Sequence, residues 1–364
     1  MKRPDITFVI GSMRIGGAER ATLHLMNGLA AKGLTIELVL LHETGDFLSK
    51  INSGIRIIDL NRRKASQGIL AFRKYLELSN PSKLFIVQNH IQIMVLLAVK
   101  MCSWKGKIIL NEQSTYLQNL KGFKGKVQMV LSKFLFPRAD MITVVSEGVG
   151  KELAILFPEL KSRIHVINNP VITNEFNQIK NQPVEHPFFE SGKKVIVTAG
   201  RLTRSKNFDL LIHAFKIVIQ HIPAKLIILG DGKQMSHLIK LKERLGLGDE
   251  ISLQGFVSDP CRYFSKADLF VLSSDYEGLP GVIIEALGCG CKVVSTDCEN
   301  GPREILSDEK YGWLSPVGNI QALSEKIQIA LKANVDSSML IRRANDFHED
   351  KIVNDYLIFL NTLK

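Results

Sequence analysis

The sequence predicts an α/β protein made of two doubly wound, parallel-sheet domains. At 364 residues the chain is long for one core and comfortable for two domains of ordinary size. Short apolar runs alternate with helical segments in two successive series, which is the pattern of parallel sheets covered by helices. Between the series, residues 174–192 are polar, contain Pro183 and Pro187, and lack periodicity, as expected of an interdomain linker.

The first series lies within residues 1–173, the predicted first domain. Its predicted strands are 6–10, 36–41, 55–60, 84–88, 107–110, 141–145 and 165–167. Ligands of open α/β sheets bind beyond the carboxyl ends of strands, so His90 and Glu112, which follow two of these runs, are candidate site residues. A lone histidine is more often structural, and that alternative stays open for His90. For Ser146 and Glu147 the favoured interpretation is a helix cap with an acidic first turn.

A glycine pair, Gly16-Gly17, stands where the first strand turns into an amphipathic helix that ends near Gly33. This geometry suits a phosphate or sugar loop at the edge of a parallel sheet. A tight turn that needs glycine for steric reasons explains the pair equally well. The spacing is not G-x-G-x-x-G, so the dinucleotide fingerprint is absent.

The second series occupies residues 193–344, the predicted second domain. Its predicted strands are 195–199, 226–229, 251–253, 269–272 and 292–295. Arg201 and Lys206 follow the strand at 195–199 and place two cations past its end.

The loop after residues 269–272 has the features of an anion site. Pro280 stands where a helix can begin, and the N–H groups of Gly281 and Val282 would project from that helix start, where the macrodipole favours a phosphate. Glu277 and Glu285 frame the site. Carboxylates would repel a phosphate but accept hydrogen bonds well from sugar hydroxyls.

Charge and composition narrow the function classes. The chain is 45% hydrophobic and 23% charged, which is globular composition. Its net charge is +11, and residues 1–170 hold 24 Lys and Arg against 12 Asp and Glu, so the first half should be drawn to an anionic surface or substrate. The five cysteines include no C-x-x-C pair, which disfavours structural zinc and favours a reduced cytosolic protein.

No segment has the length of a membrane span or the pattern of a secretion signal, which predicts a cytoplasmic protein. Residues 122–138 place apolar side chains at helical spacing among lysines. Such a helix lies either on an anionic membrane or on the domain core with a solvated basic face; the second alternative is favoured by the segment alone, the first by the domain charge.

Several motifs together resemble the retaining glycosyltransferases of family 4, a large bacterial group with the GT-B fold. The matching elements, in family order, are Gly16-Gly17-Ala18-Glu19-Arg20, Gly200-Arg201 with Lys206, Gly230-Asp231-Gly232, Gly255-Phe256-Val257, and Glu277 with Glu285. The resemblance spans essentially the whole chain. It implies two Rossmann-like domains that face each other across a cleft, with a C-terminal helix, about residues 345–364, returning to the first domain.

The resemblance also implies a role for each matching residue. Arg201, Lys206 and the N–H groups of Gly281 and Val282 would bind the donor diphosphate, with Glu285 on the ribose and Glu277 on the transferred sugar. The remaining donor contacts would come from Gly16, Gly17, Gly200, Gly230, Phe256 and Val257. The acceptor would meet Gly17, His90 and Glu112. Glu112, or Gln113 if the register shifts by one, stands where many relatives have a histidine. Glu112 is therefore a candidate catalytic residue beside Arg201, Lys206 and Glu277, and the acceptor class is in doubt.

The expected activity is transfer of a sugar from a nucleotide-diphosphate sugar, expected to be UDP-linked, to a lipid-linked or glycan acceptor of cell-surface polysaccharide synthesis. No D-x-D motif is present, so no metal or other cofactor is expected. The enzyme is expected to be peripheral on the inner face of the cytoplasmic membrane. Alternatives are a UDP-sugar epimerase of the same fold, a sugar phosphorylase, and a non-catalytic nucleotide-sugar or nucleic-acid binder. Nucleic acid is disfavoured by 7% aromatic residues and no basic stripe with stacking side chains.

Overall fold

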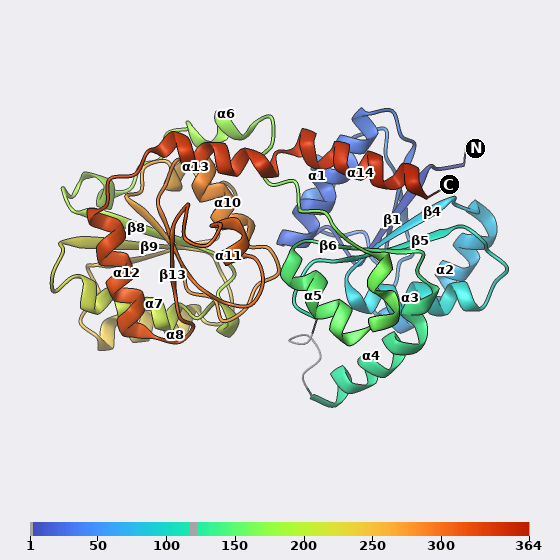
Figure 1. Ribbon diagram of the computed structural model, residues 1–364, viewed down its shortest axis with the longest axis horizontal. Coiled ribbons are helices and arrows are strands. Elements are labelled where there is room, and N and C mark those ends of the chain that lie inside the picture. Colours follow the sequence, from blue (N-terminus) through green and yellow to red (C-terminus); the bar gives the residue numbers. More distant parts are fainter. Residues whose placement is uncertain (1–2, 117–121, 364) are drawn as a thin grey trace. The chain divides into compact units, whose positions relative to one another are not determined.

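The computed structural model describes residues 3–116 and 122–363. The chain forms two compact α/β units (Figure 1). Unit 1 consists of Met1–Pro170 and Glu349–Lys364, and unit 2 consists of Val171–His348. The prediction of two parallel-sheet α/β domains is therefore confirmed.

In unit 1, the described strands form one parallel sheet in the order β3-β2-β1-β4-β5-β6-β7. The strands are β1 (Ile6–Ile10), β2 (Ile36–Leu40), β3 (Arg56–Asp59), β4 (Lys83–Val87), β5 (Lys107–Glu112), β6 (Met141–Val144) and β7 (Ile164–Val166). The helices are α1 (Gly17–Ala31), α2 (Ala65–Ser79), α3 (Asn89–Lys100), α4 (Gly122–Leu135), α5 (Glu147–Leu156) and the returning α14 (Glu349–Thr362). The central strands β1 and β2 are buried along their whole length because helices flank them.

Unit 2 repeats the plan with the order β10-β9-β8-β11-β12-β13. Its strands are β8 (Lys194–Ala199), β9 (Ala224–Leu229), β10 (Ile251–Gly255), β11 (Leu269–Leu272), β12 (Val293–Thr296) and β13 (Trp313–Ser315). Its helices are α6 (Phe176–Lys180), α7 (Phe208–Val218), α8 (Met235–Arg244), α9 (Cys261–Phe264), α10 (Gly281–Gly288), α11 (Pro302–Ile305), α12 (Ile320–Lys332) and α13 (Ser337–Ala344).

Alternate residues of the unit 2 strands supply two separate cores. Val195 and Val197 of β8 belong to one cluster and Ile196 to the other, because successive strand side chains point to opposite faces. Phe270 and Val271 of β11 divide in the same way. The sheet of unit 2 is therefore covered on both faces.

The segment predicted as a linker, residues 174–192, belongs to unit 2, and that prediction is wrong. It contains α6 and a short 3-10 helix, Pro187–Glu190. Phe176 and Val184 are buried in one of the unit 2 cores. Their apolar surface stabilises the segment against the domain, although its prolines and polar residues suggested an exposed connection.

The C-terminal helix returns to unit 1, as the resemblance implied. Tyr356, Phe359 and Leu360 of α14 are buried in the unit 1 core. Gly28 of α1 lies directly beneath Val353, where a Cβ atom would overlap the valine side chain. Helices α1 and α14 therefore pack closely, and the two ends of the chain stabilise the same core.

Candidate active site

Both sheets have a topological switch point, where the strand order reverses. In unit 2 it lies between β8 and β11, and in unit 1 between β1 and β4. Ligands of doubly wound sheets bind beyond the carboxyl ends of the strands at such a point. The loops after these strands carry most of the predicted site residues.

The loop after β8 ends in a 3-10 turn, Arg204–Lys206, which positions Lys206 beside the sheet edge. Asn207 follows with a φ of 46° and caps α7, its side-chain oxygen accepting from Leu210 N–H at 3.2 Å. Asparagine tolerates this left-handed conformation and is a favoured helix N-cap. Asn207 therefore ends the loop at a fixed place and turns the chain into the helix.

The loop after β11 is tied to this turn by hydrogen bonds. Asp275 N–H donates to Ser205 O at 2.8 Å, and the Asn207 amide donates to the Asp275 carboxylate at 2.7 Å. Ser273 Oγ donates to Lys206 O at 2.8 Å. The two loops at the switch point are therefore held in register.

Lys206 and Glu277 meet directly across these loops. Lys206 Nζ lies 2.5 Å from Glu277 Oε1, and Ser274 Oγ donates to the same oxygen at 2.6 Å. The side chain of Glu277 is 12% exposed and that of Lys206 is 23% exposed, so both are largely shielded from water. An ammonium group has three donors, so Lys206 can contact an anionic ligand while it holds Glu277 in place.

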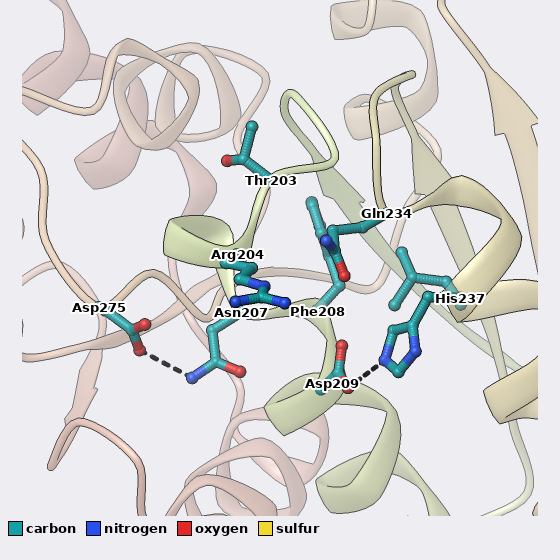
Figure 2. Close-up of a pocket in the computed structure, with 9 residues that line it drawn as sticks. Thr203, Arg204, Asn207, Phe208, Asp209, Gln234, His237 and Asp275 are labelled. Carbon is teal, nitrogen blue, oxygen red and sulfur yellow. Dashed lines mark hydrogen bonds and ion pairs between the residues drawn. The ribbon is translucent and has the colours of Figure 1, made fainter.

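A pocket of about 390 Å³ lies beside the hydrogen bond between Asn207 and Asp275 (Figure 2). Asn207 and Asp275 line it on one side, and the Asp209 carboxylate pairs with His237 at 2.6 Å on another. This pocket was not predicted. The pocket shares the hydrogen bond between Asn207 and Asp275 with the predicted site, and this bond fixes the loop that carries Lys206.

Helix α10 supplies the predicted anion site and the second carboxylate. It begins at Gly281 after Pro280, whose backbone is extended. Gly281 and Val282 are partly exposed, whereas Glu285 is buried on the same helix. Gly288 packs on the side chains of Ile172 and Phe176, and this contact anchors the helix in the core.

Backbone hydrogen bonds join the loop after β8 to the loop after β9, and the loop after β9 to the end of β10. Leu202 N–H donates to Asp231 O at 2.9 Å, and Gly230 N–H donates to Gly255 O at 2.7 Å. Gly230 has a φ of 142°, and a Cβ atom there would overlap the carbonyl oxygen of Gly200. Glycine is therefore required at position 230 by conformation and by space.

Other predicted donor contacts lie at the same edge. Gly200 and Arg201 follow β8, and Arg201 is exposed. Phe256 is 51% exposed just after β10, and Val257 packs partly against the core. The structure thus gathers the predicted donor residues of unit 2 at the carboxyl ends of β8, β9, β10 and β11.

In unit 1, the glycine pair opens α1. Gly16 is the N-cap with an extended backbone, φ −171°, and a Cβ atom at Gly17 would meet nothing within 4 Å. Any residue can adopt the extended conformation of Gly16, and a side chain at position 17 would have open space. The backbone conformation of Gly16 therefore does not require glycine, space does not require glycine at position 17, and the backbone of Gly17 is accessible.

Gln88, between β4 and α3, is a residue that the sequence analysis missed. Its φ is 71°, a conformation uncommon for residues other than glycine. Its side chain accepts from Gly11 N–H at 3.2 Å and donates to Glu19 at 2.7 Å, so it ties the loop after β1 to α1. Such strain persists only where the surroundings fix it, and it concentrates at functional sites. His90, two residues later on α3, is exposed, and its imidazole lies near Gly11.

Glu112 is the last residue of β5 and is buried, 4% exposed. Burial raises its pKa to about 8, and the nearby amide groups of Gln92 and Asn89 offset part of the effect. Its Oε1 atom has no hydrogen-bond partner among the described residues. Glu112 is therefore held largely as the neutral acid at pH 7.

Ser146, after β6, caps α5 through Val149 N–H, as predicted.

In the part of the chain that the structure describes, no cluster of three or more His, Cys, Asp or Glu side chains is arranged to hold a metal ion. None of the described helices has the length and hydropathy needed to cross a bilayer.

Comparison with known proteins identifies the family. The family model for glycosyl transferases group 1 matches residues 180–347, and the model for glycosyltransferase family 4 matches residues 15–175. An uncharacterised glycosyltransferase of Methanocaldococcus jannaschii is 31% identical over 290 residues, covering 70% of this chain and 71% of that protein. This chain belongs to the glycosyltransferases of group 1 and family 4.

Other relatives of this glycosyltransferase align with it over a longer part of the chain. The N-acetylgalactosamine-N,N'-diacetylbacillosaminyl-diphospho-undecaprenol 4-alpha-N-acetylgalactosaminyltransferase of Campylobacter jejuni is 29% identical over 370 residues, covering 96% of this chain and 98% of that protein. The Anabaena protein HepE, crystallised with UDP and glucose, matches the fold with a TM-score of 0.80 at 18% identity, covering 99% of this chain and 100% of the other. The glycosyltransferase therefore has the GT-B fold. It is an enzyme of the hexosyltransferase type.

Proposed function

We propose that this enzyme moves a sugar from a UDP-sugar to a lipid-linked acceptor, with retention of anomeric configuration and without a metal ion. The observation that carries the donor assignment is the Lys206–Glu277 pair at the switch point of unit 2. A shielded ammonium beside a carboxylate offers one group for a diphosphate and one for sugar hydroxyls.

The charges of the site suit departure of the diphosphate. When the bond between the anomeric carbon and the phosphate oxygen breaks, negative charge grows on the leaving UDP. Lys206, Arg201 and the N–H groups at the start of α10 would stabilise that charge, so they act in the transition state as well as in binding. The acceptor oxygen bonds to the anomeric carbon on the same face, and its proton passes to the leaving phosphate oxygen.

Glu285 on α10 is proposed to accept from the ribose hydroxyls and Glu277 from the transferred sugar. The loops with Gly200, Gly230, Phe256 and Val257 would receive the rest of the nucleotide. These assignments are supported by their common place at the carboxyl edge of one sheet. The UDP assignment draws support from the nucleotide bound to HepE.

Unit 1 is proposed to receive the acceptor. It holds 26 Lys and Arg against 15 Asp and Glu, whereas unit 2 holds 21 of each, so the whole net charge of +11 lies in unit 1. A diphospho-lipid acceptor is anionic, and the name of the Campylobacter jejuni relative includes diphospho-undecaprenol. The loop at Gly16 and Gly17, with His90 and Glu112, would meet the acceptor and the donor sugar. The proposed location is the cytoplasmic face of the membrane, where the protein would be peripheral.

The test is a turnover assay over a panel of nucleotide sugars with lipid extract as acceptor and EDTA present. We expect one UDP-sugar to be consumed, EDTA to leave the rate unchanged, and the product linkage to keep the donor anomeric configuration by NMR. Loss of turnover in EDTA or an inverted product would contradict the mechanism. Conversion of the UDP-sugar to its epimer without transfer would contradict the transferase assignment.

A further inference from the structure

Helix α4 of unit 1 exposes an apolar stripe, defined here as Val127, Val130 and Phe134. Their exposed fractions are 44%, 53% and 77%. Residues spaced by three, four and seven lie on one face of a helix, so the three side chains form a continuous line. Single exposed apolar residues are normal on a protein surface, but an aligned set on one helix requires an explanation.

The stripe is not the face by which α4 packs on its domain. Ser132 and Leu135 of the same helix are buried, and Gln128 donates to Asn89 of α3. The 3-10 turn that follows, Phe136–Arg138, buries Phe136 completely. Helix α4 is therefore anchored along another side, and its apolar stripe is left to solvent.

Basic residues flank the stripe. Lys126 and Lys133 are exposed and seven residues apart, so both lie along one side of it. Arg138 is exposed where the 3-10 turn ends. The sequence of α4 contains no Asp or Glu, and unit 1 carries the entire net charge of the chain.

This combination selects one occupant. A protein partner would have to match an apolar line and a basic flank with its own acidic groups, whereas an anionic bilayer offers hydrocarbon and negative headgroups side by side at every point. We propose that α4 docks on an anionic phospholipid bilayer, with Val127, Val130 and Phe134 inserted at the headgroup boundary and Lys126, Lys133 and Arg138 on the lipid phosphates.

The proposal deepens the proposed function, because a lipid-linked acceptor lies in such a bilayer, and it rests on that function only for its biological purpose. Three apolar side chains alone bind a bilayer weakly, and a few lysines alone also bind it weakly. Both contributions are therefore needed, as for other anchors that combine an apolar group with basic residues. Binding should be reversible and should depend on salt.

The experiment is co-sedimentation of the full-length protein with vesicles of phosphatidylglycerol and phosphatidylcholine, or of phosphatidylcholine alone. We expect binding only to the first. Val130→Gln/Phe134→Gln and Lys126→Gln/Lys133→Gln should each lower the partition coefficient by about tenfold or more. Ile358→Gln is the matched apolar control, since Ile358 is 68% exposed on α14, at the opposite end of unit 1 from α4 (Figure 1). Lys216→Gln/Lys332→Gln, two exposed lysines of unit 2, is the matched charge control.

Unchanged partition in both α4 variants would overturn the proposal, and so would equal losses in the controls. A change from dimer to monomer in Val130→Gln/Phe134→Gln, without a change in vesicle binding, would assign the stripe to a second copy of the chain and overturn it too. Circular dichroism shows whether each variant folds. Hydrolysis of the UDP-sugar in solution separates the two hypotheses, because the α4 variants should retain it even if vesicle binding is lost.

Discussion

Glu112, which is proposed to meet the acceptor, is buried at an energetic cost. Its pKa is about 8 in the folded protein against 4.5 for an ordinary glutamate. Between these values the unfolded chain has released the proton and the folded protein has kept it, so the free energy of unfolding falls as the pH rises through this window. The slope reaches about 1.4 kcal/mol per pH unit for one group.

We predict that Glu112→Gln removes this pH dependence. The variant should match the wild type near pH 4.5 and become progressively more stable than it up to about pH 8, above which the difference stays constant. Urea unfolding of both proteins across this range measures the effect. A difference that does not vary with pH would show that Glu112 ionises normally.

At the residue scale the sequence predicted which groups are present but not their environment. Lys206 and Glu277 were predicted as site residues, yet their contact depends on two loops that are 71 residues apart along the chain. Gln88 was missed because a positive φ at glutamine has no sequence signature, unlike the same conformation at glycine or asparagine. The burial of Glu112 likewise follows from packing around β5, which local pattern does not specify.

Gly230 shows how the loops of unit 2 depend on one another. Its Cα hydrogen faces the carbonyl of Gly200, and its φ of 142° is open to few residues other than glycine. We predict that Gly230→Ala lowers the free energy of unfolding by about 1–3 kcal/mol or more and weakens UDP binding, because it separates the loops after β8 and β9. Gly248→Ala is the control, since a Cβ atom there meets nothing within 4 Å. Equal stability and UDP affinity for the two variants would contradict this role.

Elements with a clear period were predicted well, and short or polar elements were not. The strands β1, β8 and β11 were recognised because they are apolar runs bounded by turn residues. Strand β13 was missed, since Trp313–Ser315 is three residues long and has no detectable alternation. Helix α6 was assigned to a linker because only its few apolar residues, among them Phe176, reveal that it packs on the domain.

At the scale of the whole molecule, α14 stabilises unit 1 although it follows unit 2 in the chain. Tyr356 is buried against Phe85 and Phe359, and Asn111 Nδ2 lies 3.5 Å from its hydroxyl. We predict that Tyr356→Ala lowers the unfolding free energy of unit 1 by about 3–5 kcal/mol. Tyr356→Phe, which keeps the ring, should cost only about 1 kcal/mol.

Urea unfolding with and without UDP can separate the two units, because a bound ligand raises the stability only of the unit that binds it. In Tyr356→Ala, the unfolding transition that UDP does not shift should move to a lower urea concentration. The UDP-dependent transition should keep its midpoint. Movement of the UDP-dependent transition alone would mean that α14 does not stabilise unit 1.

The two-unit organisation could be predicted from the two βα series. The exact division at Pro170 and His348 could not, because it depends on how α6 and α14 pack.

The most direct test of the donor site is the affinity for UDP and for UMP, measured by calorimetry with EDTA present. Lys206 beside Glu277 should recognise the second phosphate, so we predict that the wild type binds UDP about 10–100-fold more tightly than UMP. Lys206→Ala should lose this preference, and Lys240→Ala, at an exposed lysine of α8, should retain it. Equal affinity for UDP and UMP in the wild type, or an unchanged preference in Lys206→Ala, would contradict a diphosphate site at Lys206.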